Sequence, residues 1–127
     1  MPAGAKLFIA LGSLFALAAV ALGAFGAHGL KARLSAEMLG VYQTGVQYHF
    51  YHSLGLVLVG IACFHLPESG PLRAAGWLMV AGVVVFSGSL YALSLGAPRW
   101  LGALAPLGGL AFLAAWAAFA WAVLRTG

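Results

Sequence analysis

The 127-residue sequence is poor in charged residues, above all in acids. Six of its residues are Lys or Arg, only Glu37 and Glu68 are acidic, and Asp and Asn are absent. A pair of carboxylates for general acid–base catalysis is therefore excluded, as is a carboxylate chain for proton transfer. The single cysteine, Cys63, has no partner within the chain, so an intrachain disulfide is excluded as well.

Hydrophobic residues make up 64% of the sequence and charged residues 6%, with a mean hydropathy of +1.04. A soluble domain of this size could not cover its surface with so few polar groups. The hydrophobic residues gather in four stretches, Leu7–Ala27, Tyr48–Leu66, Ala74–Leu95 and Leu101–Leu124. Each is about long enough to cross a bilayer as a helix. The sequence therefore predicts a multi-pass membrane protein, an all-α four-helix transmembrane bundle in one domain, with spans at about residues 7–27, 42–66, 74–95 and 101–124.

Local signals place the helix ends. Ser35 is a plausible N-cap with Glu37 in the first turn, so a helix is expected to begin there and to run past Leu58. Pro106 leaves two alternatives for the last span. Either a helix begins near Trp100 and kinks at Pro106, or residues 96–105 form an irregular connection and Pro106 opens the helix. We favour the second alternative slightly.

The basic residues all lie outside the four stretches. Such positions are typical of contacts with lipid headgroups, not of a nucleic-acid surface. In a four-span arrangement they divide equally between the two membrane sides, so their charge does not fix the orientation. The residues are Lys6, Lys31, Arg33, Arg73, Arg99 and Arg125.

Small residues recur at spacings of three and four in the first stretch, which predicts a close helix-packing seam. The helix-packing candidates are Gly12, Ala16, Ala19, Gly23 and Gly26, joined later in the chain by Gly88, Gly108 and Gly109.

Polar and glycine-rich clusters occur at residues 23–28, 43–52, 86–91 and 106–109, and a hairpin arrangement would bring them to one membrane side. This enrichment would suit a polar cavity open to one face, although a hydrated interface could produce the same pattern. On a helical wheel Gln43, Gln47 and Tyr51 fall on one side of the second span, and Tyr48, His49 and His52 fall roughly opposite. His49 is expected about one turn inside the membrane boundary. The candidate polar site comprises His28, Gln43, Gln47, Tyr48, His49, His52, Ser87, Ser89 and Tyr91.

Four blocks in this order resemble the family called domain of unknown function 423, small YgdD/YwdK-like bacterial membrane proteins with mitochondrial relatives. The blocks are the Gly-Ala-Phe-Gly-Ala-His run at 23–28, the Gln, Tyr and His residues between Gln43 and His52, residues Phe86–Tyr91, and Pro106 with Gly108 and Gly109. The similarity covers nearly the whole chain. It implies a four-helix membrane protein and carries over no catalytic roles.

Three functions fit these observations. The first, which we favour, is a structural or accessory subunit that packs with itself or with a larger membrane complex. The second is an oligomeric channel or carrier for a small neutral or anionic solute, lined by the candidate polar site. The third is a metal or haem site using His28, His49 and His52, which lacks its usual acidic and Cys companions. We expect no cofactor, no metal site and no enzymatic activity, because no acid is available to orient a His beside Ser87 or Ser89.

Overall fold

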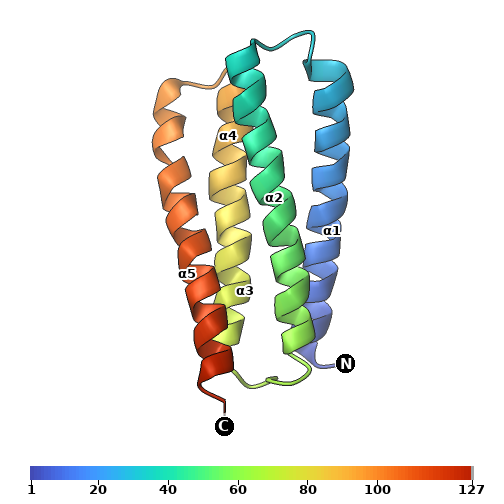
Figure 1. Cartoon of the computed structure of the whole chain (residues 1–127), viewed down its shortest axis with the longest axis vertical. Helices are drawn as coiled ribbons and strands as arrows, with labels where there is room; N and C mark the ends of the chain where they lie inside the picture. Colours follow the sequence, from blue (N-terminus) through green and yellow to red (C-terminus); the bar gives the residue numbers. More distant parts are fainter. Residues whose placement is uncertain (127) are drawn as a thin grey trace.

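The computed structural model describes residues Met1–Thr126, which contain helices and no strands. The helices form four rods (Figure 1). The first is α1 (Ala3–Phe25), continued by the π-helical turn η1 (Gly26–Leu30). The second is α2 (Ala36–Ala62). The third combines α3 (Gly70–Gly82), the π-helical segment η2 (Val83–Ser87) and α4 (Gly88–Ser94). The short 3-10 helix η3 (Arg99–Ala103) precedes the fourth, α5 (Ala105–Leu124).

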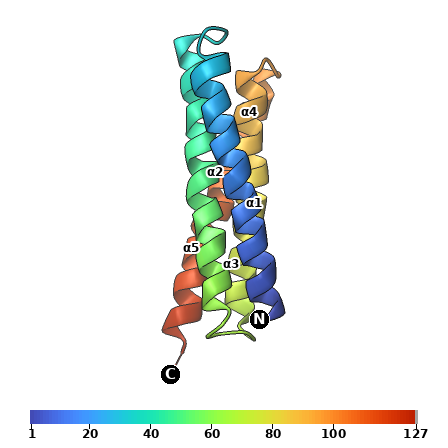
Figure 2. The same ribbon diagram turned by 90° about the vertical axis from the view of Figure 1, so that its right-hand side faces the viewer.

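Successive rods run in opposite directions, and both termini lie at one end of the bundle (Figures 1 and 2). Backbone contacts are most extensive between α1 and α2 and between α3 and α5, while α2 also packs against α3, η2 and α4. The backbones of α2 and α5 barely approach each other. The rods therefore follow one another as a folded row in which α1 and α5 are the outer members.

Side-chain caps and backbone restrictions explain where the helices begin. Ser35 Oγ accepts a hydrogen bond from the Met38 amide at 3.1 Å, as the sequence predicted. Ser69 Oγ accepts one from the Leu72 amide at 3.2 Å and so caps α3. Of the two alternatives for the last span, the structure has Pro106 in the first turn of α5, as in the second. The connection before it is not wholly irregular, because Arg99–Ala103 form the 3-10 helix η3.

Three helical segments are long and apolar enough to cross a membrane, by length and composition, among the residues described: Ala3–Leu30, Gly70–Ser94 and Arg99–Leu124. The sequence led us to expect four. The α2 helix is as long as the others, but Gln, His and Tyr residues in its centre interrupt the apolar run. The all-α class is confirmed, and α2 is a more polar helix than its neighbours.

Aromatic rings packed over glycines hold neighbouring rods together. Phe8 of α1 lies against Gly76 of α3, Phe112 of α5 lies against Gly82, and Tyr91 of α4 lies against Gly45 of α2. A methyl group at any of these glycines would overlap the ring that faces it. Each ring therefore fills the space that a side chain would occupy at the glycine it faces.

The α1–α2 contact is a close backbone approach in which the predicted packing residue Gly12 takes part. A Cβ atom at Gly12 would lie 2.7 Å from the Ser53 carbonyl oxygen and 2.9 Å from the Val57 amide nitrogen. Because these are backbone atoms, they could move away only if the two helices separated.

We expect Gly12→Ala to destabilise the bundle by about 1–3 kcal/mol, as overpacking does elsewhere. Gly40→Ala is the matched control, because Gly40 lies on α2 with nothing within 4 Å of its would-be Cβ. That control should be neutral, or stabilising by up to about 1 kcal/mol through helix propensity. Reversible unfolding in mixed micelles would measure both, and equal stability of the two variants would contradict the packing.

Candidate functional site

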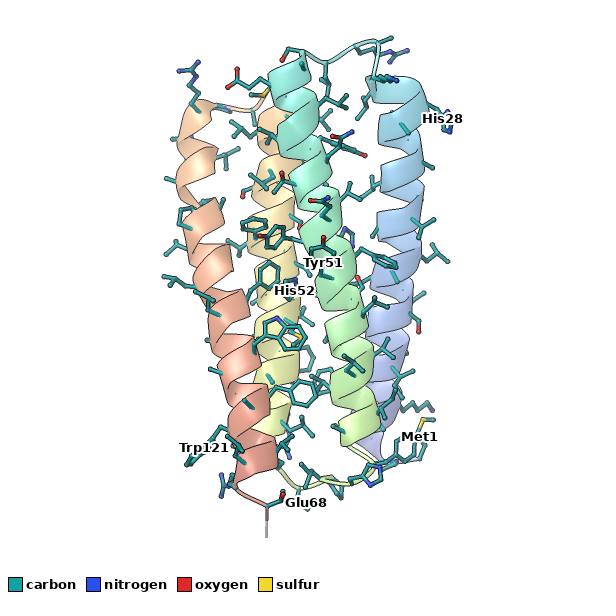
Figure 3. The ribbon with its side chains drawn as sticks, in the orientation of Figure 1. Met1, His28, Tyr51, His52, Glu68 and Trp121 are labelled. Carbon is teal, nitrogen blue, oxygen red and sulfur yellow. The ribbon has the colours of Figure 1, made fainter. Side chains whose placement is uncertain are left out.

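The two central histidines of the candidate site lie near the middle of α2. His49 is thirteen residues from Ala36 and thirteen from Ala62, so it is the middle residue of that helix. Figure 3 shows His52 near the middle of the bundle's length. Both side chains are buried, His49 with 6% and His52 with 5% of its surface exposed. A buried, central histidine needs hydrogen-bond partners within the protein.

His49 connects α2 with α4 and α1. Its Nδ1 lies 2.8 Å from the Tyr91 hydroxyl oxygen. The edge of its ring meets Phe15 of α1, with centroids 6.0 Å apart and an interplanar angle of 87°. Tyr91 in turn packs beside Tyr42, with ring centroids 5.4 Å apart. This polar contact therefore sits within a cluster of rings drawn from three helices.

His52 connects α2 with α5, and its partners fix its protonation. The Trp116 indole N–H donates to His52 Nε2 at 3.0 Å, so Nε2 carries no proton. His52 Nδ1 lies 2.7 Å from the Tyr48 carbonyl oxygen, which can only accept, so Nδ1 carries the proton. The imidazole also stacks on Phe112 at 3.5 Å between centroids, with 9° between the planes. His52 is thus held as the neutral Nδ1–H tautomer.

Hydroxyl groups add further ties around these histidines. Ser87 Oγ donates to the Gly45 carbonyl at 2.7 Å and joins η2 to α2. Tyr42 Oη donates to the Leu22 carbonyl at 2.6 Å and joins α2 to α1. Ser53 and Ser89 donate to carbonyls of their own rods, those of His49 and Phe86. Every buried side-chain nitrogen or oxygen in the described part of the chain has a hydrogen-bond partner.

This set of side chains, which we call the central polar network, comprises Tyr42, His49, His52, Ser53, Ser87, Tyr91 and Trp116. It joins α2 to α1, to η2 and α4, and to α5. Residues 1–126 hold no cluster of three or more His, Cys, Asp or Glu side chains suited to a metal ion. Both nitrogens of His52 are engaged, so a metal could bind there only if the Trp116 bond broke.

The structure does not bring the other predicted site residues into this network. His28 is exposed on η1, near the end of the bundle away from the termini (Figure 3), and not beside His52. His28 points away from the central polar network, because Gly26 and Leu30 take the inward positions of that turn. Gln43 and Gln47 are exposed on the outward face of α2, and Tyr48 is 39% exposed at the edge of the network.

The predicted packing residues also divide. Gly12, Gly26 and Gly108 each lie against a neighbouring rod, and Ala19 is buried. Gly23 lies near Val46 of α2, and Ala16 is half-buried. Gly88 and Gly109, in contrast, have nothing within 4 Å of a would-be Cβ. Most of the small residues are therefore used within the chain.

A lateral groove opens beside the network, where α2 and α5 diverge. Its cavity measures about 670 Å³, and its walls are mainly aromatic and aliphatic. Tyr48 and His52 supply its polar atoms from α2. The groove is lined by Tyr48, His52, Phe86, Pro106, Gly109, Leu110, Phe112, Leu113 and Trp116.

Sequence reasoning missed Tyr42, Ser53 and Trp116. The signal for Trp116 was its depth, because tryptophan anchors belong at helix ends and this one lies twelve residues into the 20-residue helix α5. Although 42% of the Trp116 surface is exposed, its indole N–H turns toward α2 and finds its partner in His52.

Comparison with known proteins places this architecture among bacterial membrane proteins. Residues 22–109 match the family described as "Protein of unknown function (DUF423)". The UPF0382 membrane protein YwdK of Bacillus subtilis is 54% identical over 111 residues, which are 87% of this chain and 90% of YwdK. The UPF0382 membrane protein SH2409 of Staphylococcus haemolyticus is 49% identical over 87% of this chain and 89% of its own length. No solved structure matches. With its three apolar helices, the chain is a multi-pass membrane protein.

Trp116→Phe removes the indole donor and keeps a ring, so we expect a loss of about 1 kcal/mol of unfolding free energy. Trp121→Phe is the control, because Trp121 is 60% exposed and points outward (Figure 3). Thermal unfolding in one detergent would compare them. Equal unfolding free energies would argue against the His52 bond.

The tautomer of His52 can be tested directly. In protein labelled with ¹⁵N at histidine, the His52 ring should show a protonated Nδ1 and an unprotonated Nε2 in the NMR spectrum. The Trp116→Phe variant should keep the proton on Nδ1, because the Tyr48 carbonyl still accepts from it, while the Nε2 signal should shift because its donor is gone. An Nε2–H signal from His52 in the unmodified protein would contradict the geometry.

Proposed function

Because the chain belongs to the DUF423 family, we propose that its four rods all span the bilayer and serve as a structural or accessory subunit. Such a subunit packs with copies of itself or with a larger membrane complex and carries out no chemistry of its own.

The topology supports α2 as the fourth span. The α1 and α3 helices both begin at the end of the bundle where the termini lie (Figure 1). If both cross the membrane, α2 must carry the chain back between them. At 27 residues it is about 40 Å long, enough to cross a hydrocarbon layer of about 30 Å.

The observation that carries the proposal is that the central polar network is closed. Its side chains bond to each other or to backbone carbonyls, and every buried side-chain nitrogen or oxygen of the described residues has a partner within the chain. Polar side chains used in this way join helices in a membrane, where lipid offers no hydrogen bonds. The histidines are thus accounted for as structural groups, and the outer surface remains for partners.

Native mass spectrometry of the protein, gently extracted from its own membrane, tests this function. We expect a defined oligomer or a complex with a larger membrane protein, and an absorption spectrum without bands from a bound chromophore. A bare monomer with a stoichiometric bound solute, metal or haem would contradict the proposal.

One observation favours a second candidate, a carrier or binding protein for a small solute. The groove between α2 and α5 is of ligand size, and Tyr48 lies in its wall with its ring 39% exposed. Its mainly apolar lining suits a neutral solute better than an anion. A Tyr48→Phe variant that lost a co-purified molecule while keeping its oligomeric state would support this candidate.

A further inference from the structure

The outward face of α2 changes character halfway along the helix. Residues 43, 47, 51, 54, 58 and 61 follow one another at spacings of three and four, so they form one stripe, and all are exposed. The lower half of the stripe is apolar, with Leu54, Leu58 and Ile61, as expected beside lipid tails. The upper half carries Gln43, Gln47 and Tyr51 instead. We call these three residues the amide stripe.

Gln47 lies deep enough for its amide to be costly in lipid. It is eleven residues from the start of α2, or about 16 Å along a helix of about 40 Å. If the hydrocarbon layer of about 30 Å is centred on the bundle, this amide lies about 11 Å inside it.

An amide in hydrocarbon loses its water partners without replacement. The α2 side chains that form hydrogen bonds within the described residues are Tyr42, Thr44, His49, His52 and Ser53, and not Gln47. The partner for this amide must therefore come from outside the chain.

The surface beside the amide stripe admits another helix. A groove of about 500 Å³ runs between α1 and α2 at this level. Its α1 wall is formed by Val20 and by three small residues, Ala19, Gly23 and Ala24, which let a neighbouring backbone approach closely. Tyr51 closes the other wall with 53% of its surface exposed (Figure 3).

We propose that the amide stripe and this groove form a two-fold symmetric interface with a second copy of the chain, in which the Gln47 amides pair. This inference rests on the proposed function, because it names the partner of a packing subunit. A glutamine amide is both donor and acceptor, so it complements itself across a two-fold axis. Two copies inserted in the same direction also hold Gln47 at the same depth, which another partner would match only by coincidence.

Cysteine cross-linking in liposomes tests the face. In a Cys63→Ala background that removes the native cysteine, Ala24→Cys places a thiol in the groove and Leu113→Cys places one on α5. Both positions are exposed. We expect a bifunctional maleimide to join two copies through position 24 and not through position 113.

Energy transfer between dye-labelled copies, diluted with lipid, tests the amide. Gln47→Leu should raise the dissociation constant of the dimer about threefold to twentyfold, the range that interhelical hydrogen bonds in membranes span. Gln47→Asn keeps an amide, so its dissociation constant should lie between those of the wild type and Gln47→Leu. Ala114→Leu, at an exposed position of α5 outside both grooves, is the control and should leave the dissociation constant unchanged.

Two outcomes would overturn the inference, and they are distinguishable. Cross-linking through position 113 alone, together with a Gln47→Leu dissociation constant equal to that of the wild type, would reject this face. The proposed packing function would remain. A monomer at every lipid dilution that also purifies without a partner complex would reject both.

Discussion

Hydrocarbon gives a polar atom nothing to bond with, and α2 carries its most polar residues at the centre of the bundle. The other rods supply the hydrogen-bond partners that these residues need. Ser87 reaches the Gly45 carbonyl, Tyr91 reaches His49, and Trp116 reaches His52, so the third rod and α5 each bring a partner to α2. Of the four rods, only α2 is not apolar enough by composition to be recognised as a membrane span, yet each of the other three forms a hydrogen bond with it.

Close packing and polar satisfaction depend on each other here. Tyr91 can reach His49 because its ring passes over Gly45, where any side chain would block it. Phe112 fills the space above Gly82 and in the same position forms the stacking surface for His52. Glycines thus place the rings, and the rings fix the histidines. Gly45 and Gly82 therefore contribute to the hydrogen bonding of the histidines, although neither bonds to them.

Much of the architecture could be predicted from the sequence because membrane helices leave strong local signals. Length and hydropathy indicated four rods, Ser35 marked the start of α2, and Pro106 marked the first turn of α5. The wheel also separated the Gln43 edge from the His52 edge. These features depend only on residues close together in sequence.

The arrangement of the site could not be predicted in the same way. A wheel gives angles within one helix, and α2 has polar residues on both edges, so periodicity did not say which edge faces inward. His28 shares a glycine-rich block with Gly26, yet one points outward and the other packs against Tyr42, because a step of two residues turns a helix halfway round. The partners Trp116 and Tyr91 lie 64 and 42 residues from the histidines they bind, a relation set only by the folded row.

In this folded row the contact between α2 and α5 differs in kind from the other contacts between rods. Between α1 and α2, and between α3 and α5, backbones meet closely, whereas α2 and α5 meet mainly through side chains, above all His52, Phe112 and Trp116. A seam made of ring contacts and one hydrogen bond can open without breaking a backbone contact. The lateral groove lies along this seam, and His52 and Trp116 both belong to its lining. The hydrogen bond that gives the Trp116 N–H its partner therefore also joins the two walls of the groove.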